Sequence, residues 1–225
     1  YEADLTACRI PLQQVLDPVG VEHIAAEVTE IDTDARSVTA QRDGQALALD
    51  YDRLVLAAGS RVARPAIPGL AEFGFDVDTF DGARRLADHL DTLAANPRTS
   101  GAGTVVVVGA GLTGIETARE LPARLAAIFD STVATKVLLV DHQPHVGSDM
   151  GPSARPLIES ALSDNGVHVI TGTSVTSVDI GAVTLSSGDT LPAATLVWCA
   201  GMRANPLTSQ FSVPLDQFGR LPVDD

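Results

Sequence analysis

The sequence of 225 residues contains little cysteine, few aromatic residues and a shortage of positive charge. Its two cysteines, Cys8 and Cys199, include no CxxC pair and are too few for a disulfide framework or a zinc site. We therefore expect two reduced structural thiols and no bound metal. Lysine and arginine number 15 against 29 acidic residues, and the resulting net charge of −14 argues against nucleic acid as a partner.

Long apolar runs are also missing. No segment approaches the roughly 18 consecutive apolar residues that cross a bilayer, and the first residues resemble no signal peptide. We therefore expect a cytoplasmic protein. Hydrophobic residues nevertheless make up 45% of the chain, which is enough to bury a core. At roughly 150 residues per domain, the length predicts one domain and part of another.

Apolar patterning divides the chain into an early β-rich part and a later alternation of strands and helices. Residues 21–50 predict a β-meander, and the apolar run 51–59 predicts a buried strand after it. Residues 78–97 have a helical period from Phe80 to Leu93, and the helix should end at Asn96 and Pro97. From Thr104 onward, apolar strands alternate with amphipathic helices. This order predicts an α/β fold with a Rossmann-like parallel sheet, covering helices and a second β-meander.

A glycine-rich turn directly follows four valines and opens a predicted helix; its residues are Gly109, Ala110, Gly111, Leu112, Thr113 and Gly114. This context makes the turn a candidate for dinucleotide binding. Gly109 would allow the tight turn, Gly111 the close approach of backbone to a pyrophosphate, and Gly114 the close packing of helix on strand. The helix N-terminus would face the phosphates with unpaired N–H groups and roughly half a positive charge.

Asp141 ends the next apolar strand, where a carboxylate can accept hydrogen bonds from the hydroxyls of the adenosine ribose. It lies 141 − 109 = 32 residues after Gly109 instead of the usual ~20, so an insertion is expected around Pro122 and residues 129–136. A 2′-phosphate about 4 Å from this carboxylate would cost roughly 4 kcal/mol at an effective dielectric of about 20. The sequence therefore favours NAD(H) over NADP(H).

Two further residues have two interpretations each. Glu116, two residues after Gly114, either complements the helix dipole or lies near the reactive end of the cofactor. Trp198 is expected to pack in the core, and stacking on a ligand is the alternative.

Five segments, taken together and in order, resemble the FAD-dependent pyridine nucleotide-disulfide oxidoreductase superfamily. They cover nearly the whole chain and read YDRLVLAAGS, VVVVGAGLTGIETARE, LLVD, GVHVITGTSVTSVD and DTLPAATLVWCAGMRANP. The insertion before LLVD and the ending WCAGMRANP are most similar to the type II NADH dehydrogenase branch. The resemblance implies two Rossmann-like domains, one for FAD and an inserted one for NAD(P)H.

On the NADH side, the resemblance assigns residues 109–114 to the pyrophosphate and Asp141 to the ribose. It places Glu116 beside the nicotinamide, and the turn Ala200-Gly201 at the strand end under which the nicotinamide lies.

On the flavin side, the resemblance implies that the backbone of Val28 contacts the adenine of FAD. It also implies that the turn Ala57-Ala58-Gly59 contacts the diphosphate of FAD. The family often has Thr where Ala58 stands, so a hydroxyl contact would be missing there. We expect residues 1–75 to form a partial FAD-binding domain, 76–201 an NAD(H)-binding domain, and 202–225 a segment that returns to the FAD domain. The family's N-terminal GxGxxG and C-terminal Gly-Asp motifs are not in the sequence, which predicts an internal fragment that binds flavin weakly or not at all.

These expectations describe part of an FAD-dependent NADH dehydrogenase that passes hydride from NADH to flavin, and electrons on to a quinone or another small-molecule acceptor. No catalytic acid or base is implied within this stretch, and the fragment alone is expected to be inactive.

A ferredoxin or rubredoxin reductase stays open within the enzyme class. A disulfide reductase is less favoured, because the cysteine pair that thioredoxin reductases carry in this domain is absent. The alternative from another class is a non-catalytic NAD(H)-binding sensor or regulatory module. Membrane association is left open, since it depends on C-terminal segments in the quinone-reducing branch.

Overall fold

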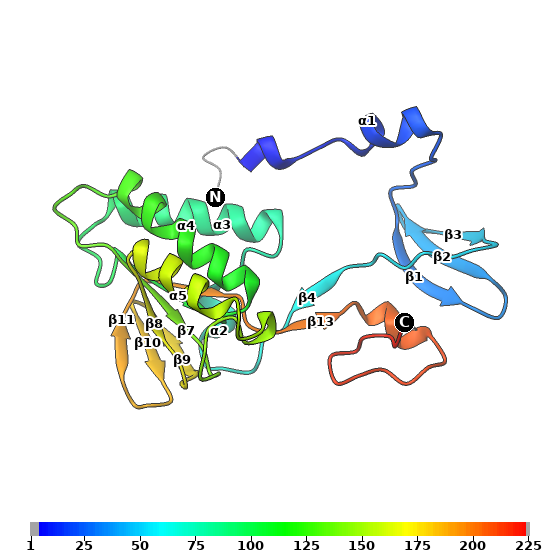
Figure 1. Cartoon of the computed structure of the whole chain (residues 1–225). Coiled ribbons are helices and arrows are strands. Elements are labelled where there is room, and N and C mark those ends of the chain that lie inside the picture. Colours follow the sequence, from blue (N-terminus) through cyan, green and yellow to red (C-terminus); the bar gives the residue numbers. More distant parts are fainter. Residues whose placement is uncertain (1–4, 224–225) are drawn as a thin grey trace. The chain divides into compact units, whose positions relative to one another are not determined.

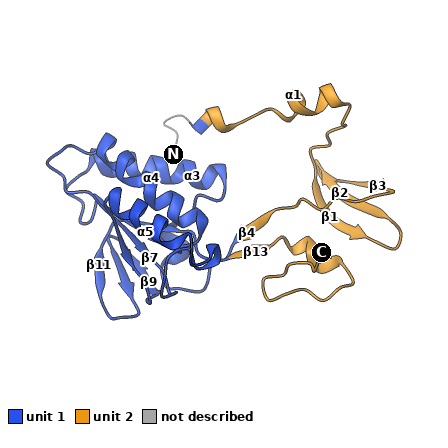
Figure 2. Ribbon diagram, in the orientation of Figure 1, with its two compact units in different colours: residues 1–5, 62–201 blue, residues 6–61, 202–225 orange. Residues whose placement is uncertain are grey.

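The computed structural model describes residues 5–223 and divides them into two compact units (Figures 1 and 2). The larger unit consists of Leu5 and Val62–Gly201, and the smaller unit of Thr6–Arg61 and residues 202–223. The first boundary therefore lies earlier than residue 75, where the sequence pattern placed it. The reason is packing: Leu70 is 1% exposed in the core of the larger unit, and the strand Gly74–Phe75 belongs to its sheet.

A five-stranded parallel sheet forms the centre of the larger unit. Its strands lie in the order β5 (Gly74–Phe75), β12 (Thr195–Trp198), β6 (Thr104–Val108), β7 (Lys136–Val140) and β8 (Val167–Ile170). All neighbouring pairs are parallel. The central strands are continuous runs of valine and leucine because both faces of the sheet are covered. This arrangement confirms the predicted α/β, Rossmann-like fold.

Three helices and a small antiparallel sheet cover the two faces (Figure 1). The helices α3 (Phe80–Ala95), α4 (Leu112–Ile128) and α5 (Arg155–Asp164) pack on one set of sheet side chains, which includes Val107 and Leu139. The strands β9 (Val175–Asp179), β10 (Ala182–Leu185) and β11 (Thr190–Pro192) form the predicted second meander and pack on the opposite set, which includes Val106 and Leu138. Short elements complete this unit; they are α2 (Leu70–Phe73) and η3 (Ser148–Met150).

The insertion predicted before β7 consists of regular helix and a short loop. Helix α4 continues through Pro122 to Ile128, and residues 129–135 then lead to β7. The wide spacing between Gly109 and Asp141 therefore comes from a long helix followed by a loop, and it does not disturb the strand order.

The smaller unit contains the first predicted meander. Its antiparallel strands are β1 (Glu27–Asp32), β2 (Ser37–Arg42) and β3 (Gln45–Asp50). Preceding them are the short helices η1 (Leu5–Cys8), α1 (Leu12–Leu16) and η2 (Asp17–Val19). The connecting strands β4 (Ser60–Val62) and β13 (Met202–Ala204) pair with each other.

The C-terminal segment packs on this meander through the helix η4 (Pro206–Gln210). The Gln210 amide acts as a substitute strand partner: its Oε1 accepts from the Ile31 N–H at 2.6 Å, and its Nε2 donates to the Thr29 carbonyl at 3.0 Å. Residues 202–223 and the meander therefore belong to one unit.

The buried strand expected over residues 51–59 is not formed. These residues have no strand assignment, and Val55 is 87% exposed. An apolar run forms a stable strand only beside a hydrogen-bonded neighbour, and no strand of the described range pairs with this segment. The sequence-based expectation was wrong at this point because it rested on apolar content alone.

Candidate functional site

The turns that follow β6, β7 and β12 meet at the carboxyl edge of the parallel sheet. The Gly109 N–H donates to the Val140 carbonyl at 2.8 Å, and the Cys199 N–H donates to the Val108 carbonyl at 2.8 Å. The strand ends thus stay in register beyond their last paired residues. In open α/β sheets this edge is where ligands bind.

The three glycines of the turn have different surroundings. Gly109 has φ +103°, and a Cβ there would lie 2.8 Å from the Cα of Ala200. At Gly114 a Cβ would lie 1.8 Å from the Gly109 carbonyl oxygen, so only glycine lets α4 begin this close to the strand. At Gly111 a Cβ would meet no atom within 4 Å. The first and third glycines therefore serve packing, and the second faces open space, as the motif predicts.

The N-terminus of α4 has no side-chain cap. Gly111 is the N-cap residue, and the first turn contains no acidic residue. The first N–H groups of a helix have no intrahelical partner, and the aligned peptide dipoles make this end positive. Together with the space beside Gly111, this end fits a pyrophosphate.

Asp141 lies directly after β7 and is 8% exposed. Its Oδ2 accepts the N–H of Ala110 in the glycine-rich turn, and its Oδ1 accepts the N–H of Gln143 at 2.7 Å. The ring Nδ1 of His142 is 3.5 Å from the same Oδ1. A carboxylate has about four acceptor positions, so these bonds leave room for a ribose hydroxyl. The bond to Ala110 was not foreseen from the sequence.

The other residues predicted to contact NADH lie next to the glycine-rich turn. Leu112, Thr113 and Glu116 are exposed along the start of α4. Ala200 is half-buried against Gly109, and Gly201 is exposed with φ +74°.

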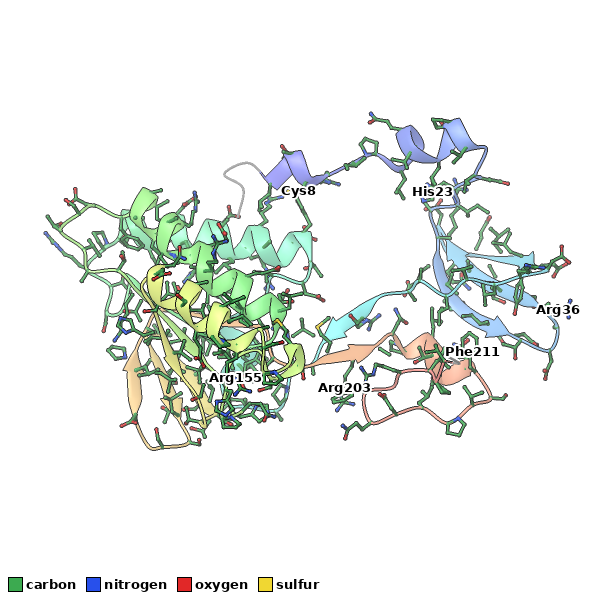
Figure 3. The ribbon with its side chains drawn as sticks, in the orientation of Figure 1. Cys8, His23, Arg36, Arg155, Arg203 and Phe211 are labelled. Carbon is green, nitrogen blue, oxygen red and sulfur yellow. The ribbon has the colours of Figure 1, made fainter. Side chains whose placement is uncertain are left out.

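The two cysteines differ in their surroundings. Both thiols are free; Cys8 is exposed on η1 (Figure 3), and Cys199 is half-buried. Burial raises the pKa of the Cys199 thiol to about 11, while a hydrogen bond to the hydroxyl of Thr117 opposes the rise in part. Cys199 thus stays protonated at neutral pH, as expected of a structural thiol.

The predicted flavin contacts lie in the other compact unit. Val28 is in β1, next to a register shift of that strand, and is 37% exposed. Ala57, Ala58 and Gly59 are exposed and outside regular structure. The Asn205 side chain donates to the Ala58 carbonyl at 3.1 Å, which ties this segment to the C-terminal part of the chain.

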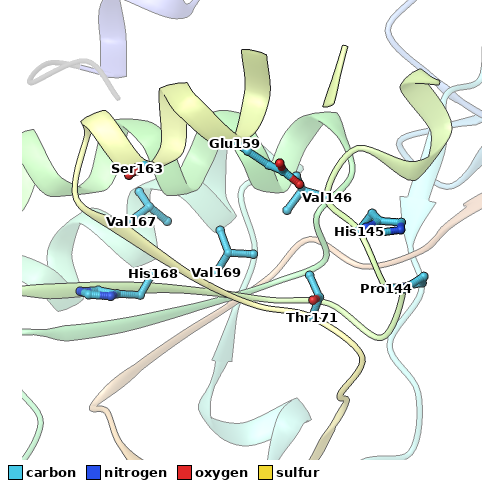
Figure 4. A pocket seen from close by; sticks show the side chains of 9 residues that line it. All are labelled: Pro144, His145, Val146, Glu159, Ser163, Val167, His168, Val169 and Thr171. Atoms are coloured by element: carbon cyan, nitrogen blue, oxygen red, sulfur yellow. The ribbon is translucent and has the colours of Figure 1, made fainter. Parts of the chain in front are cut away.

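A pocket of about 390 Å³ lies beside the edge strand β8 (Figure 4). Helix α5 lines it with Glu159 and Ser163, and His145 and His168 also border it. Among residues 5–223, no group of three or more His, Cys, Asp or Glu side chains is arranged to hold a metal ion. No helix in the same range is both long and apolar enough to span a membrane.

Comparison with known proteins identifies the class. Residues 13–225 match the pyridine nucleotide-disulphide oxidoreductase family, and the chain belongs to it. Over its whole length the chain is 64% identical to an NADH dehydrogenase-like protein of Mycobacterium tuberculosis, of which it covers 56%. It is also 30% identical to the type II NADH:quinone oxidoreductase Ndh of the same organism, with 90% of this chain and 48% of the relative aligned.

A solved structure supports the fold. NDH2 from Plasmodium falciparum in complex with NADH has a TM-score of 0.69 and 17% identity, covering 87% of this chain and 44% of that chain. The chain spans about half the length of the proteins it matches. The family and the NADH dehydrogenase relatives imply NAD(H), and FAD in the full-length protein, as the sequence predicted.

Proposed function

We propose that this chain is the NADH-binding part of an FAD-dependent NADH dehydrogenase that passes electrons to a quinone-type acceptor. Within the chain, residues 62–201 would form the NADH-binding unit, and the smaller unit would form part of the FAD domain. The similarity to a type II NADH:quinone oxidoreductase supports the choice of acceptor.

The observation that carries the proposal is the contrast between the three glycines. Neighbouring backbone leaves no space for a Cβ at Gly109 and Gly114, whereas a Cβ at Gly111 would meet no protein atom within 4 Å. A ligand that approaches the backbone explains that position. The uncapped N-terminus of α4 supplies N–H groups and positive potential for the same ligand.

The residues of this chain would act by binding and orientation. Residues 109–114 would hold the pyrophosphate of NADH, Asp141 its adenosine ribose, and the turn Ala200-Gly201 would support the nicotinamide, with Glu116 nearby. When bound, the nicotinamide supplies the hydride and FAD accepts it. Val28 and residues 57–59 would contribute contacts to FAD.

The test uses two glycine variants that differ in their effect on the protein itself. Gly111→Ala should leave the melting temperature close to wild type, because its methyl group meets no protein atom. It should weaken NADH binding at least tenfold, about 1.4 kcal/mol, because the methyl group occupies the space next to the pyrophosphate. Isothermal titration calorimetry of NADH and thermal denaturation provide the two measurements.

Gly114→Ala is the matched variant, since its methyl group would collide with the Gly109 carbonyl. It should destabilise the fold by about 1 to 3 kcal/mol. Leu157→Ala, at a 76% exposed position on α5 outside the proposed site, serves as a neutral control. Unchanged NADH affinity in the Gly111 variant would contradict the proposed site. In a longer protein that carries flavin, stopped-flow bleaching by NADH separates the enzyme from a sensor, which would bind NADH without flavin reduction.

A further inference from the structure

Trp198, the single tryptophan of the chain, has an indole N–H shared by two backbone carbonyls. Its Nε1 is 2.8 Å from the Ala63 carbonyl oxygen and 2.8 Å from the Ala200 carbonyl oxygen. The side chain is 8% exposed and packs in the core between the parallel sheet and the second meander. The ring therefore packs in the core, as expected, while its Nε1 donates to the loops that contain Ala63 and Ala200.

These two carbonyls belong to segments far apart in the sequence. Ala63 directly follows β4, where the chain enters the larger unit, and Ala200 lies two residues beyond β12, just before the chain leaves it. A further bond joins the same segments: the Ala63 N–H donates to the Gly201 carbonyl at 2.9 Å. The turn Ala200-Gly201 is thus held from one side by the entering segment.

From the other side, the same turn contacts the glycine-rich motif. The Cα of Ala200 lies 2.8 Å from the position that a Cβ of Gly109 would take. Neither Ala200 nor Gly201 has a polar side chain with which to fix its own position. Within the part of the chain that the structure describes, Trp198 makes the only side-chain hydrogen bond to this turn.

We infer that Trp198 is a positioning residue for the nicotinamide half of the coenzyme. This inference rests on the function proposed above. The indole N–H fixes the turn Ala200-Gly201 against Ala63, at the point where the chain enters the larger unit. The pyrophosphate site depends on residues 109–114 and not on this bond. Loss of the indole N–H should therefore affect ligands that carry a nicotinamide more than ligands that end at the ribose.

Trp198→Phe keeps an aromatic ring in the core and removes the N–H, which leaves the half-buried Ala63 and Ala200 carbonyls without this donor. Because one hydrogen bond contributes a modest net free energy, we expect the Kd for NADH to rise about fivefold to tenfold. The Kd for ADP-ribose, which has the pyrophosphate and both riboses but no nicotinamide, should change less than about twofold. Calorimetric titration of the 225-residue chain with both ligands measures the two values.

Leu196→Val is the matched control, because Leu196 is on the same strand, 1% exposed and in the same core cluster, with no hydrogen bond to the turn. It should lower the melting temperature and leave the ratio of the two Kd values unchanged. Equal weakening of NADH and ADP-ribose by Trp198→Phe would assign Trp198 a structural role only and overturn the inference. Unchanged binding of both ligands would overturn it as well.

A measurement on the wild-type chain covers the case in which Trp198→Phe does not fold. NADH should slow hydrogen exchange of the Ala63 amide, whose acceptor is Gly201, by more than ADP-ribose does. Equal protection by the two ligands would overturn the inference. If wild type binds neither ligand, the proposed function itself fails, and that result is distinct from binding without discrimination.

Discussion

The carboxylate of Asp141 has one set of partners in the protein and, by our proposal, another in the coenzyme. Asp141→Asn removes its charge while keeping an oxygen that can accept one of its backbone N–H bonds. A charge about 4 Å from a 2′-phosphate costs roughly 4 kcal/mol at an effective dielectric of about 20. We therefore expect the ratio of Kd for NADPH to Kd for NADH to fall at least tenfold in this variant, measured by calorimetry.

Asp179→Asn is a suitable control, because it removes one negative charge from an exposed position on the second meander. It should leave the ratio unchanged. The same ratio in Asp141→Asn and wild type would show that this carboxylate does not select the sugar. Asp141→Ala would in addition lose both backbone bonds, and its melting temperature should lie below that of Asp141→Asn.

Single residues were predictable where the motif constrains the backbone. The different roles of Gly109, Gly111 and Gly114 follow from their spacing, and the structure shows the surroundings that this spacing requires. The bond from Ala110 to Asp141 joins residues 31 positions apart. Nothing local in the sequence encodes such a bond, because it depends on how two strand ends meet. The partners of the Trp198 N–H were missed for the same reason.

Helix α3 contains a half-buried histidine, His89, whose neutral form is favoured in the folded chain. The ring of His89 stacks on Phe75, with centroids 4.4 Å apart, and its Nε2 lies 3.1 Å from both the Ala194 carbonyl oxygen and the Thr195 hydroxyl. Burial lowers the pKa of His89 below 6.5, and the hydrogen bond to Ala194 opposes this only in part. The unfolded chain therefore takes up a proton at a higher pH than the folded chain does.

Because protonation is easier in the unfolded chain, neutral His89 contributes to the free energy of unfolding. This contribution is fully present above pH 6.5 and is lost as the pH falls through the lowered pKa of the folded chain. The melting temperature should decrease between pH 7.5 and 5.5, and His89→Gln, which cannot take up this proton, should show a smaller decrease. Thermal denaturation by circular dichroism measures both slopes. His168→Gln, at an exposed position on β8, should retain the wild-type slope. Identical slopes for wild type and His89→Gln would contradict this account.

Regular elements were predictable in proportion to their length. Helix α3 has a clear apolar period and ends at Asn96, as expected, and the valine and leucine runs became the parallel strands. The strands β4, β5, β11 and β13 have only two or three residues each, so they show no period that a sequence could reveal. Residues 51–59 show the opposite error. Their apolar residues predicted a strand, but no strand among the described residues pairs with them.

The two compact units differ strongly in the size of their cores, which the sequence as a whole did not reveal. In the larger unit, both faces of the sheet carry clusters of buried aliphatic side chains. Among the described residues of the smaller unit, the buried apolar side chains are Ile31, Val38 and Ala40. Large apolar side chains of this unit are exposed instead, including Ile10 at 68% and Val55 at 87%. The average composition of the chain conceals this difference.

Local stability should follow the same division, because segments with few buried apolar contacts open at lower free energy. We expect amides of β1, β2 and β3 to exchange with solvent at least tenfold faster than those of β6 and β7, about 1.4 kcal/mol in opening free energy. Hydrogen exchange followed by mass spectrometry provides the comparison. Gln210→Ala, which removes both side-chain bonds to β1, should speed exchange in β1 and leave β6 unchanged. Equal protection of the two sheets, or a Gln210 effect that spreads into β6, would show that the chain unfolds as one cooperative body.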